Sequence, residues 1–381
     1  MKEGWEYKKL GEVCEILDSR RKPITKNKRE SGIIPYYGAT GLLDYVKDFI
    51  FDEKLVLLGE DGAKWGAGEI SAYIIEGKSW VNNHAHALRP KRDLLIDELL
   101  VYYLNFSNLL PFITGVTVPK LNQEKMRSIE IPIGPVKEQQ SIVDYLDSAF
   151  AKIDAMKANA EQALNEAKAL FQASLKEMLE PKEGWKENTL LALTSKIGSG
   201  ATPKGGRKVY IDEGCHLIRS MNVQYNEFKY EDLAHITDEA AEQLKGVEIQ
   251  ENDVLFNITG ASIARCCVVP TDALPARVNQ HVSVLRLKQD VLPRFLSYIL
   301  NSPRHQKELL EIGEAGSTRQ ALTKTDLENH VICYPNIDSQ TKLLNTLDFL
   351  KSKVDRLQAN YEKISQECDA LKQAILRQVF E

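Results

Sequence analysis

Two long stretches of this chain carry the same apolar stripe, and this repeat limits what the chain can fold into. From Gln139 to about Leu179, apolar side chains recur at alternating steps of four and three residues, with no Pro or Gly between them. A shift of 201 residues, which takes Ile142 to Leu343, reproduces the stripe. Such a heptad pattern is typical of a long helix that packs along another helix. The sequence therefore predicts two long helices that pair within the chain.

The expected pairing seam is uneven in size. The first stripe is rich in alanine, whereas the second has larger side chains at the matching positions, for example Leu350 opposite Ala149 in the repeat and Tyr361 opposite Ala160. Small side chains against large ones let two helices approach closely and favour this pair over self-pairing of either helix. The seam is predicted to include Ile142, Leu146, Ile153, Leu170, Leu343, Leu347, Val354 and Leu371.

Each long helix follows a globular region, and both regions begin with the same dipeptide. Gly4-Trp5 opens the first, and Gly184-Trp185 opens the second directly after Pro181, which ends the first helix. With 381 residues, the chain is long enough for two domains with their own cores. Strand-like alternation and short helical patterns predict an α+β protein, in which each domain mixes strands and helices. The predicted parts are residues 1–135, 136–180, 181–335 and 336–381.

Composition and charge exclude several protein classes. The formal net charge of −5 gives no basic footprint over the whole chain. The six cysteines form no Cys-x-x-Cys pair, which favours reduced thiols in the cytoplasm. No apolar segment approaches the ~20 residues of a membrane span, and no signal core opens the chain. His84 and His86 share one face of a predicted strand, but without a third ligand no metal site is expected.

Basic residues nevertheless gather in two loops. One lies at residues 20–29 of the first domain, where Pro23 interrupts a run of cations, and the other follows Thr202-Pro203 in the second domain. Clustered Lys and Arg can neutralise a nucleic-acid backbone, although a solvated loop is an equally good interpretation. The glycine-rich stretch 59–68 lacks the Lys and Ser/Thr of a phosphate-binding P-loop, so tight turns between strands are expected there.

The sequence contains no recognisable catalytic motif. There is no Gly-x-Ser-x-Gly elbow, no zinc-protease helix and no kinase signature. An amino-methyltransferase would need an Asn/Asp-Pro-Pro-aromatic loop, and the chain has no Pro-Pro dipeptide. Together with the duplication, this pattern favours a binding protein over an enzyme.

The order of parts resembles the specificity subunit of Type I restriction–modification systems, and the resemblance covers essentially the whole chain. That family has a variable domain, a long helix, a second variable domain and a matching helix. Several short motifs agree with it, namely the two Gly-Trp openings, Gly200-x-Thr202-Pro203, Asn279-Gln280-His281 (Asn82-Asn83-His84 in the first copy), Gly316-Ser317-Thr318-Arg319, and the helix entries Pro135 to Gln139 and Asp338-Ser339-Gln340.

The resemblance implies a division of labour. Each variable domain would read one half of a split target in double-stranded DNA, and the two helices would pair antiparallel as a coiled coil with pseudo-twofold symmetry. A helix of about 40 residues is roughly 60 Å long, or about one and a half to two turns of duplex. The chain itself would be non-catalytic and carry no cofactor. Two modification (methyltransferase) subunits would supply S-adenosylmethionine, and restriction/translocase subunits would use ATP and Mg²⁺.

Two other interpretations compete with this one. The first is a duplicated protein- or carbohydrate-binding scaffold with a helical stalk, and the second is a catalytic nuclease or methyltransferase. Under the DNA-recognition hypothesis, Arg20, Arg21, Lys22, Lys26, Lys204, Arg207 and Lys208 are expected to contact phosphates, and Lys64, Lys120, Arg219, Asn222, Arg265 and Arg319 to read bases.

Overall fold

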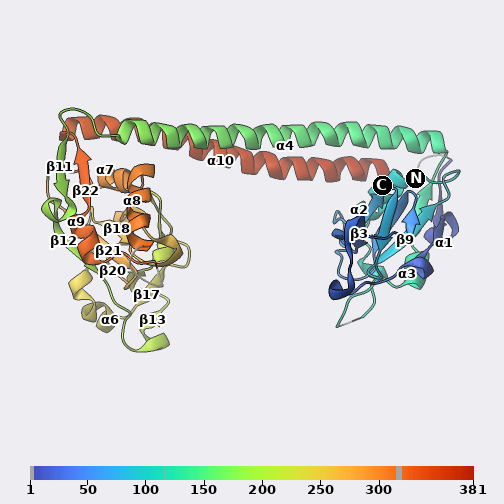
Figure 1. Ribbon diagram of the computed structural model, residues 1–381, viewed down its shortest axis with the longest axis horizontal. Helices are drawn as coiled ribbons and strands as arrows, with labels where there is room; N and C mark the ends of the chain where they lie inside the picture. Colours follow the sequence, from blue (N-terminus) through green and yellow to red (C-terminus); the bar gives the residue numbers. More distant parts are fainter. Residues whose placement is uncertain (1–3, 116, 315–319) are drawn as a thin grey trace. The chain divides into compact units, whose positions relative to one another are not determined.

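The computed structural model describes residues 4–115, 117–314 and 320–381. The chain divides into two compact units, Met1–Glu161 with Tyr361–Glu381, and Gln162–Asn360 (Figure 1). Each unit is α+β, as the sequence predicts. Among the described residues, no helix is both long and apolar enough to cross a membrane.

The first unit contains two four-stranded sheets, ordered β2-β9-β6-β7 and β4-β3-β8-β5, and the small pair β1-β10. The strands are β1 (Glu6–Lys9), β2 (Cys14–Ile16), β3 (Ser31–Gly38), β4 (Gly41–Val46), β5 (Phe51–Asp52), β6 (Leu55–Gly59), β7 (Ala72–Ile75), β8 (Lys78–Val81), β9 (Ala85–Pro90) and β10 (Glu130–Ile133). The helices before the long one are α1 (Leu10–Val13), η1 (Asp18–Arg20), η2 (Lys26–Lys28), α2 (Asp97–Phe106), η3 (Leu110–Phe112) and α3 (Gln123–Arg127).

The first core forms because β6 is apolar along its whole length. All five residues of β6 are buried, since it lies in the interior of its sheet and has covered faces on both sides. Leu99, Leu100 and Leu104 of α2 pack against one face of this sheet and form one buried cluster with Leu58 of β6. The side chains of this cluster are almost completely buried, so β6 and β9 are held in place and the positions of the loops at their ends are fixed.

The second unit repeats this arrangement with additions. Its sheets are ordered β12-β21-β18-β19 and β13-β17-β14-β20, with the pairs β11-β22 and β15-β16. The strands are β11 (Lys186–Thr189), β12 (Thr194–Ser199), β13 (Tyr210–Ile211), β14 (Cys215–Ile218), β15 (Val223–Gln224), β16 (Glu227–Phe228), β17 (Ala234–Ile236), β18 (Val254–Asn257), β19 (Cys266–Val268), β20 (Ala276–Val278), β21 (Val282–Leu287) and β22 (Val331–Tyr334). The helices are α5 (Leu190–Leu193), η4 (Gly206–Val209), η5 (Ser220–Asn222), α6 (Asp238–Gln243), η6 (Lys245–Val247), η7 (Gly260–Ser262), η8 (Thr271–Ala273), α7 (Pro293–Leu300), α8 (Pro303–Glu314) and α9 (Lys324–Asn329).

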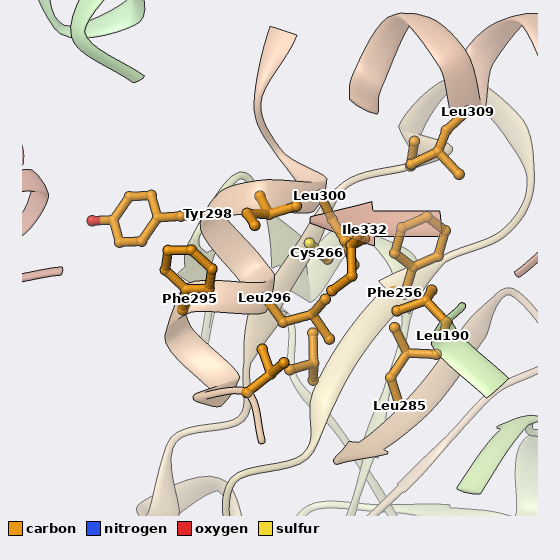
Figure 2. Close-up of a cluster of buried hydrophobic side chains, with 14 of the residues drawn as sticks. Leu190, Phe256, Cys266, Leu285, Phe295, Leu296, Tyr298, Leu300, Leu309 and Ile332 are labelled. Atoms are coloured by element: carbon orange, nitrogen blue, oxygen red, sulfur yellow. The ribbon is translucent and has the colours of Figure 1, made fainter. Parts of the chain in front are cut away.

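The core of the second unit joins its sheet to helices α7 and α8. Phe256 and Leu285 from the sheet belong to one buried cluster with Leu296 of α7, Leu309 of α8 and Ile332 of β22, and Figure 2 labels all five. All five side chains are buried. The core therefore ties α8 and the end of the domain to the central strands.

A buried glutamine shows the repeat at atomic detail. Gln139 is fully buried at the start of the first long helix; its Oε1 accepts a hydrogen bond from the Ile96 amide at 3.0 Å, and its Nε2 donates to the Leu94 and Gly134 carbonyls. In the second unit, Gln340 makes the equivalent contacts with the Leu292 amide and the carbonyls of Asp290 and Pro335. The two domains thus join their long helices in the same way.

The two long helices are α4 (Val136–Leu179) and α10 (Ile337–Phe380), shown in green and red in Figure 1. They pack together. In the first unit, Lys157 pairs with Asp369 at 3.2 Å and Lys372 with Asp154 at 2.5 Å. In the second unit, Lys168 donates to the Gln358 side chain at 2.7 Å. In the first unit the helices run antiparallel, because rising residue numbers on α4 meet falling numbers on α10.

The seam between the helices departs from the predicted heptad. Leu146, Ile153 and Leu347 are buried as expected, and Ile142, Leu343 and Val354 are half-buried. Leu170 and Leu371, however, are 65% and 48% exposed, so their assignment to the seam is wrong. Leu164 and Leu175 are buried instead. An α-helix has 3.6 residues per turn, so a strict 3.5-residue stripe drifts around it by about 20° per heptad.

Candidate nucleic-acid interface

Each domain brings the same two loop segments together through matching backbone hydrogen bonds. In the first domain, the Glu60 amide donates to the His84 carbonyl and the Leu121 amide donates to the Glu60 carbonyl, both at 2.8 Å. In the second, the Ile258 amide donates to the His281 carbonyl at 3.0 Å, and the Leu322 amide donates to the Ile258 carbonyl at 2.8 Å. These bonds make Glu60 the counterpart of Ile258.

The loop that follows β2 in the first domain, and the loop that follows β12 in the second, reach this same place. The Lys22 amide donates to the Val81 carbonyl, and the Gly200 amide donates to the Asn279 carbonyl, each at 3.2 Å. A Cβ on Gly200 would lie 1.7 Å from the Val278 carbonyl oxygen, so only glycine permits this approach. The basic loops predicted from the sequence therefore lie beside the His84 and His281 turns, within their respective domains.

In the first domain the site is a network of buried ion pairs. Arg21 binds Glu60 at 2.6 Å and Asp18 at 3.2 Å, and its side chain is only 10% exposed. Lys120 binds Glu60 from the other side at 2.7 Å. Both cations are thus held by carboxylates of their own domain, and Lys120 keeps a solvent-facing side.

The charges of this network shift the pKa of its carboxyl groups. Burial by itself would raise the pKa of Glu60, but the hydrogen bonds from Lys120 and Arg21 outweigh burial and lower it. Burial likewise opposes ionisation of Asp18, while the hydrogen bond and charge of His86, with the charge of Arg21, lower its pKa. Both groups are therefore carboxylates at neutral pH.

The two histidines of the first domain have different hydrogen-bond partners in and beside this network. His86 is fully buried, and its two ring nitrogens face the Asp18 carboxylate at 2.6 Å and the Leu121 carbonyl at 2.7 Å. His84 turns to Asp61 instead. Asp18, Glu60 and His86 lie close enough to hold a cation, but the side chains of Arg21 and Lys120 already neutralise the two carboxylates.

In the second domain the same place is an open polar hollow of about 490 Å³. It has no counterpart of the acidic pair, since Ile258 and Thr259 replace Glu60 and Asp61. Its lining residues are Ser220, Met221, Gln224, Thr259, Gly260, Ala261, Ser262, Arg265 and His281. Hydroxyl, amide, imidazole and guanidinium groups are the donors and acceptors that read base edges.

Arg265 is the cation of this hollow. Its Nη1 donates to the Gln224 side chain at 2.7 Å, and its guanidinium lies 5.3 Å from the ring centre of Tyr225. Its Nε is buried without a hydrogen-bond partner among the described residues. Ala264, just before it, has a φ of +67°, a left-handed conformation that costs energy for alanine. The backbone is thus held so that Arg265 enters the hollow.

The remaining predicted residues of the first domain lie at the surface. Lys22 and Lys26 are exposed, and Lys64 is 80% exposed with its Nζ 3.8 Å from Glu69. Arg20 is also exposed, but it donates to the Ile50 carbonyl and lies over the Phe51 ring. Lys22, Lys26 and Lys64 are therefore better placed than Arg20 to meet a ligand.

The second domain requires one correction to the site prediction, at Asn222. Asn222 is fully buried, and its amide donates to the carbonyls of Lys229 and Glu231, so it stabilises a turn and does not reach a base. Arg219 donates to the Asp232 carbonyl and has a buried Nε. Lys204 and Lys208 are exposed.

Two further predicted residues have no side-chain description. The Arg207 side chain and the whole of Arg319 lie outside the described part of the chain, the latter with the neighbouring loop motif that begins at Gly316.

The sequence prediction did not nominate Gln224, Thr259 or His281, which line the hollow. His281 Nδ1 shares a hydrogen bond with the Thr259 hydroxyl at 2.6 Å, and the Thr202 hydroxyl donates to the Gln280 side chain at 2.7 Å. The signal available was the pair of motifs around Thr202 and His281, which are short and had no assigned contact.

A family model described as the Type I restriction modification DNA specificity domain matches this chain twice, over residues 2–166 and 183–366. The chain belongs to this family. It is a specificity subunit that carries the domain in two copies, which confirms the resemblance predicted from the motifs. The family assignment also supports the prediction of a non-catalytic subunit over a nuclease, a methyltransferase or a carbohydrate-binding scaffold.

Individual relatives agree with this assignment. A putative specificity subunit of Haemophilus influenzae, S.HindORF215P, is 39% identical over 149 residues, which are 38% of this chain and 37% of that protein. The Escherichia coli EcoBI specificity subunit is 26% identical over 70% of this chain and 61% of its own length. The chain thus spans less than two thirds of these two relatives.

The fold of the specificity subunit also matches a solved structure over its full length. A structure from work on complex assembly and conformational transition of the type I R-M system has a TM-score of 0.75 at 18% identity, and the match covers 100% of this chain and 98% of the other. At this identity the likeness concerns the fold, with its two β-rich domains and two long helices.

Proposed function

We propose that this specificity subunit reads a split target in double-stranded DNA, one half with each domain. The observation that carries the proposal is the pair of equivalent loop sites. Their backbone hydrogen bonds coincide, yet the side chains they present differ in charge and shape. A target with two different half-sites needs two domains that share a backbone arrangement but present different side chains, and these two loop sites meet that need.

Base reading in the second domain is assigned to the polar hollow. Arg265 would donate to guanine, and Gln224 and His281 would select neighbouring bases through their amide and imidazole groups. In the first domain, Lys64 and the outer side of Lys120 take this role. Phosphate contacts come from the exposed Lys22, Lys26, Lys204 and Lys208, since such contacts position a protein on DNA without reading sequence.

The long helices serve two further purposes in this proposal. Their pairing sets the distance between the half-sites, and their outer faces dock two modification subunits. The stretch 138–180 holds eight acidic and four basic side chains, so it suits a protein partner better than phosphate. S-adenosylmethionine would then be bound by the modification subunits, and ATP and Mg²⁺ by restriction subunits, in the cytoplasm where the DNA lies.

The test is a selection of bipartite duplexes by the chain together with its co-encoded methyltransferase subunits. Arg265→Ala should relax the preference for one base pair in one half-site and cost about 1–3 kcal/mol there. The other half-site should be selected as before. Lys245→Ala, an exposed change on η6, serves as the control.

Two results would contradict the proposal. One is failure of the assembled complex to bind any duplex. The other is a loss in Arg265→Ala that is spread equally over both half-sites.

A further inference from the structure

Two histidines and a glutamate meet in the second domain, away from the polar hollow. His305 and Glu308 lie one turn apart on α8, and His330 follows α9 directly. His305 Nδ1 is 2.9 Å from His330 Nε2 and 3.6 Å from Glu308 Oε2. All three potential ligand atoms lie within 4.8 Å of one another. The cysteine and histidine spacing of the sequence gives no hint of this group, because the histidines are 25 positions apart.

These distances are close to those that a tetrahedral cation imposes. With bonds of about 2.0–2.1 Å, two ligands of a tetrahedral zinc ion lie about 3.3 Å apart. The distances from His305 differ from that value by a few tenths of an ångström, one shorter and one longer. Small side-chain rotations would therefore admit an ion without a change in the backbone.

The two histidines also occupy buried positions where an apolar side chain would be expected. His305 and His330 are 5% and 6% exposed. His305 precedes Leu309 by one turn on α8, and His330 precedes Ile332 by two residues; Leu309 and Ile332 belong to the apolar core shown in Figure 2. In the first domain, the counterpart of His330 is the apolar Ile129: the Leu190 amide donates to the His330 carbonyl as the Leu10 amide does to that of Ile129. The common fold therefore does not need a histidine at this position.

We propose that His305, Glu308 and His330 bind one divalent zinc-like cation. His305 would bind through Nδ1 and His330 through Nε2, so the proton now shared between these atoms moves and each ring keeps its proton on the other nitrogen. Imidazole nitrogens with a carboxylate are zinc ligands, and water completes the fourth position. The ion ties α8 to the end of α9.

The charges around the group are compatible with a cation. Burial lowers the pKa of both imidazoles, that of His305 to about 4, so both are in the neutral form that binds metal. Arg304 opposes a cation, but it binds Glu308 through Oε1 at 3.1 Å and leaves Oε2 facing His305. The Asp18, Glu60 and His86 group of the first domain differs, because Arg21 and Lys120 lie among its carboxylates.

The experiment uses the full-length chain, stripped with a chelator and titrated with Zn²⁺ and with Co²⁺. The wild type should take up about one equivalent and show the strong visible absorption of tetrahedral Co²⁺. Glu308→Gln should weaken Zn²⁺ binding by at least about tenfold. His330→Ile, which installs the residue of the first domain, should abolish binding. Glu311→Gln, an exposed change on the same helix, should leave it unchanged.

Either of two results would overturn the proposal. One is a wild-type chain that binds no Zn²⁺ and gives no tetrahedral Co²⁺ spectrum. The other is equal affinity in the wild type and in Glu308→Gln. If His330→Ile fails to fold, the Co²⁺ spectrum and the Glu308→Gln variant still decide, since the Glu308 side chain is 42% exposed and its loss leaves the histidine pair intact.

Discussion

The two domains carry the same backbone frame but fill one position of it in opposite ways. In the first domain, Glu60 is the centre of a buried charge network with Arg21 and Lys120. In the second, Ile258 occupies its place, and the neighbouring surface is an uncharged hollow apart from Arg265. The frame is held by backbone amides and carbonyls, so it does not depend on which side chains the loops carry.

The comparison separates residues that are repeated because the fold needs them from residues that differ between the domains. Gln139 and Gln340 make the same three hydrogen bonds, and Asn82 and Asn279 each accept a hydrogen bond from the histidine amide two residues on. Such residues are repeated because they satisfy backbone groups that would otherwise be buried without partners. Residues that differ at equivalent places are not bound by this requirement, and under the proposed function the exposed ones among them contact DNA.

The largest expected effect comes from the shared frame. Gln139→Leu and Gln340→Leu each leave one amide and two carbonyls buried without partners, and each unsatisfied group costs about 1–3 kcal/mol. We expect each change to lower the free energy of unfolding of its own unit by about 4 kcal/mol, and to a similar extent. Hydrogen exchange resolved by unit measures both.

The control for this pair is Gln140→Leu, an exposed change on the same helix, which should stay within about 0.5 kcal/mol. A loss confined to one of the two buried glutamines would show that the two domains do not share this support.

The next effect should be confined to the first domain. Glu60→Ile, which installs the residue of the second domain, removes the nearest carboxylate from both Arg21 and Lys120 and leaves them only Asp18 at 3.2 Å and Asp61 at 3.9 Å, respectively. Removing one partner of a buried ion pair costs about 3–5 kcal/mol, and the 41% exposure of Lys120 places this change at about 3 kcal/mol. Urea unfolding monitored through exchange of β6 should show it.

Glu6→Gln removes the exposed partner of Lys8 and serves as the matched control, with an expected change below about 1 kcal/mol. If Glu60→Ile is as stable as the wild type, the network does not support the fold, and its role would have to be binding alone.

The long helices and the repeat could be predicted from the sequence because apolar periodicity depends on local spacing. Leu146 and Ile153 of the predicted seam are buried, whereas Leu170 is exposed, because a heptad stripe drifts around a straight α-helix with each turn. Before Leu170 the buried residue is already Leu164, one position beyond Ala163, which is the site of the heptad stripe. A straight α-helix and a heptad agree over a few turns only.

The site could be predicted only in part. The sequence located the basic loops and Arg265, but exposure and pairing of a side chain depend on residues far away in the chain. Arg21 meets Glu60 across 39 positions, so its engagement is invisible in the local sequence. Asn222 fails for a more local reason: its partners are the carbonyls of Lys229 and Glu231, which come into reach only when β15 and β16 pair.

A smaller effect distinguishes the two domains by pH. Asp18 and Glu60 have lowered pKa values in the folded first domain, so their contribution to stability is complete above the unfolded values of about 3.9 and 4.3. It is lost as the pH falls below these values, through the lower folded pKa. The equivalent loop of the second domain, with Ile258 and Thr259, has no such groups.

We therefore expect acid below about pH 4 to release exchange protection at β6 before it does so at β18. Glu60→Gln should flatten the pH dependence of the first unit. Protection that falls at β6 and β18 together, or that is unchanged by Glu60→Gln, would contradict the assignment of this loss to the network.

The smallest effect concerns single exposed lysines at the matching loops. Lys22 precedes Pro23 in the first domain, and Lys204 follows Pro203 in the second; both are exposed. If each neutralises one phosphate, alanine at either position should reduce the slope of log K against log salt by about 0.9 and leave the preferred sequence unchanged. Binding of a duplex by the assembled complex at several salt concentrations measures this. Lys363→Ala, on the exposed side of α10, should leave the slope as it is. A change in base preference without a change in slope would instead mean that the loop reads bases, and the roles assigned to the loop and the hollow would then be exchanged.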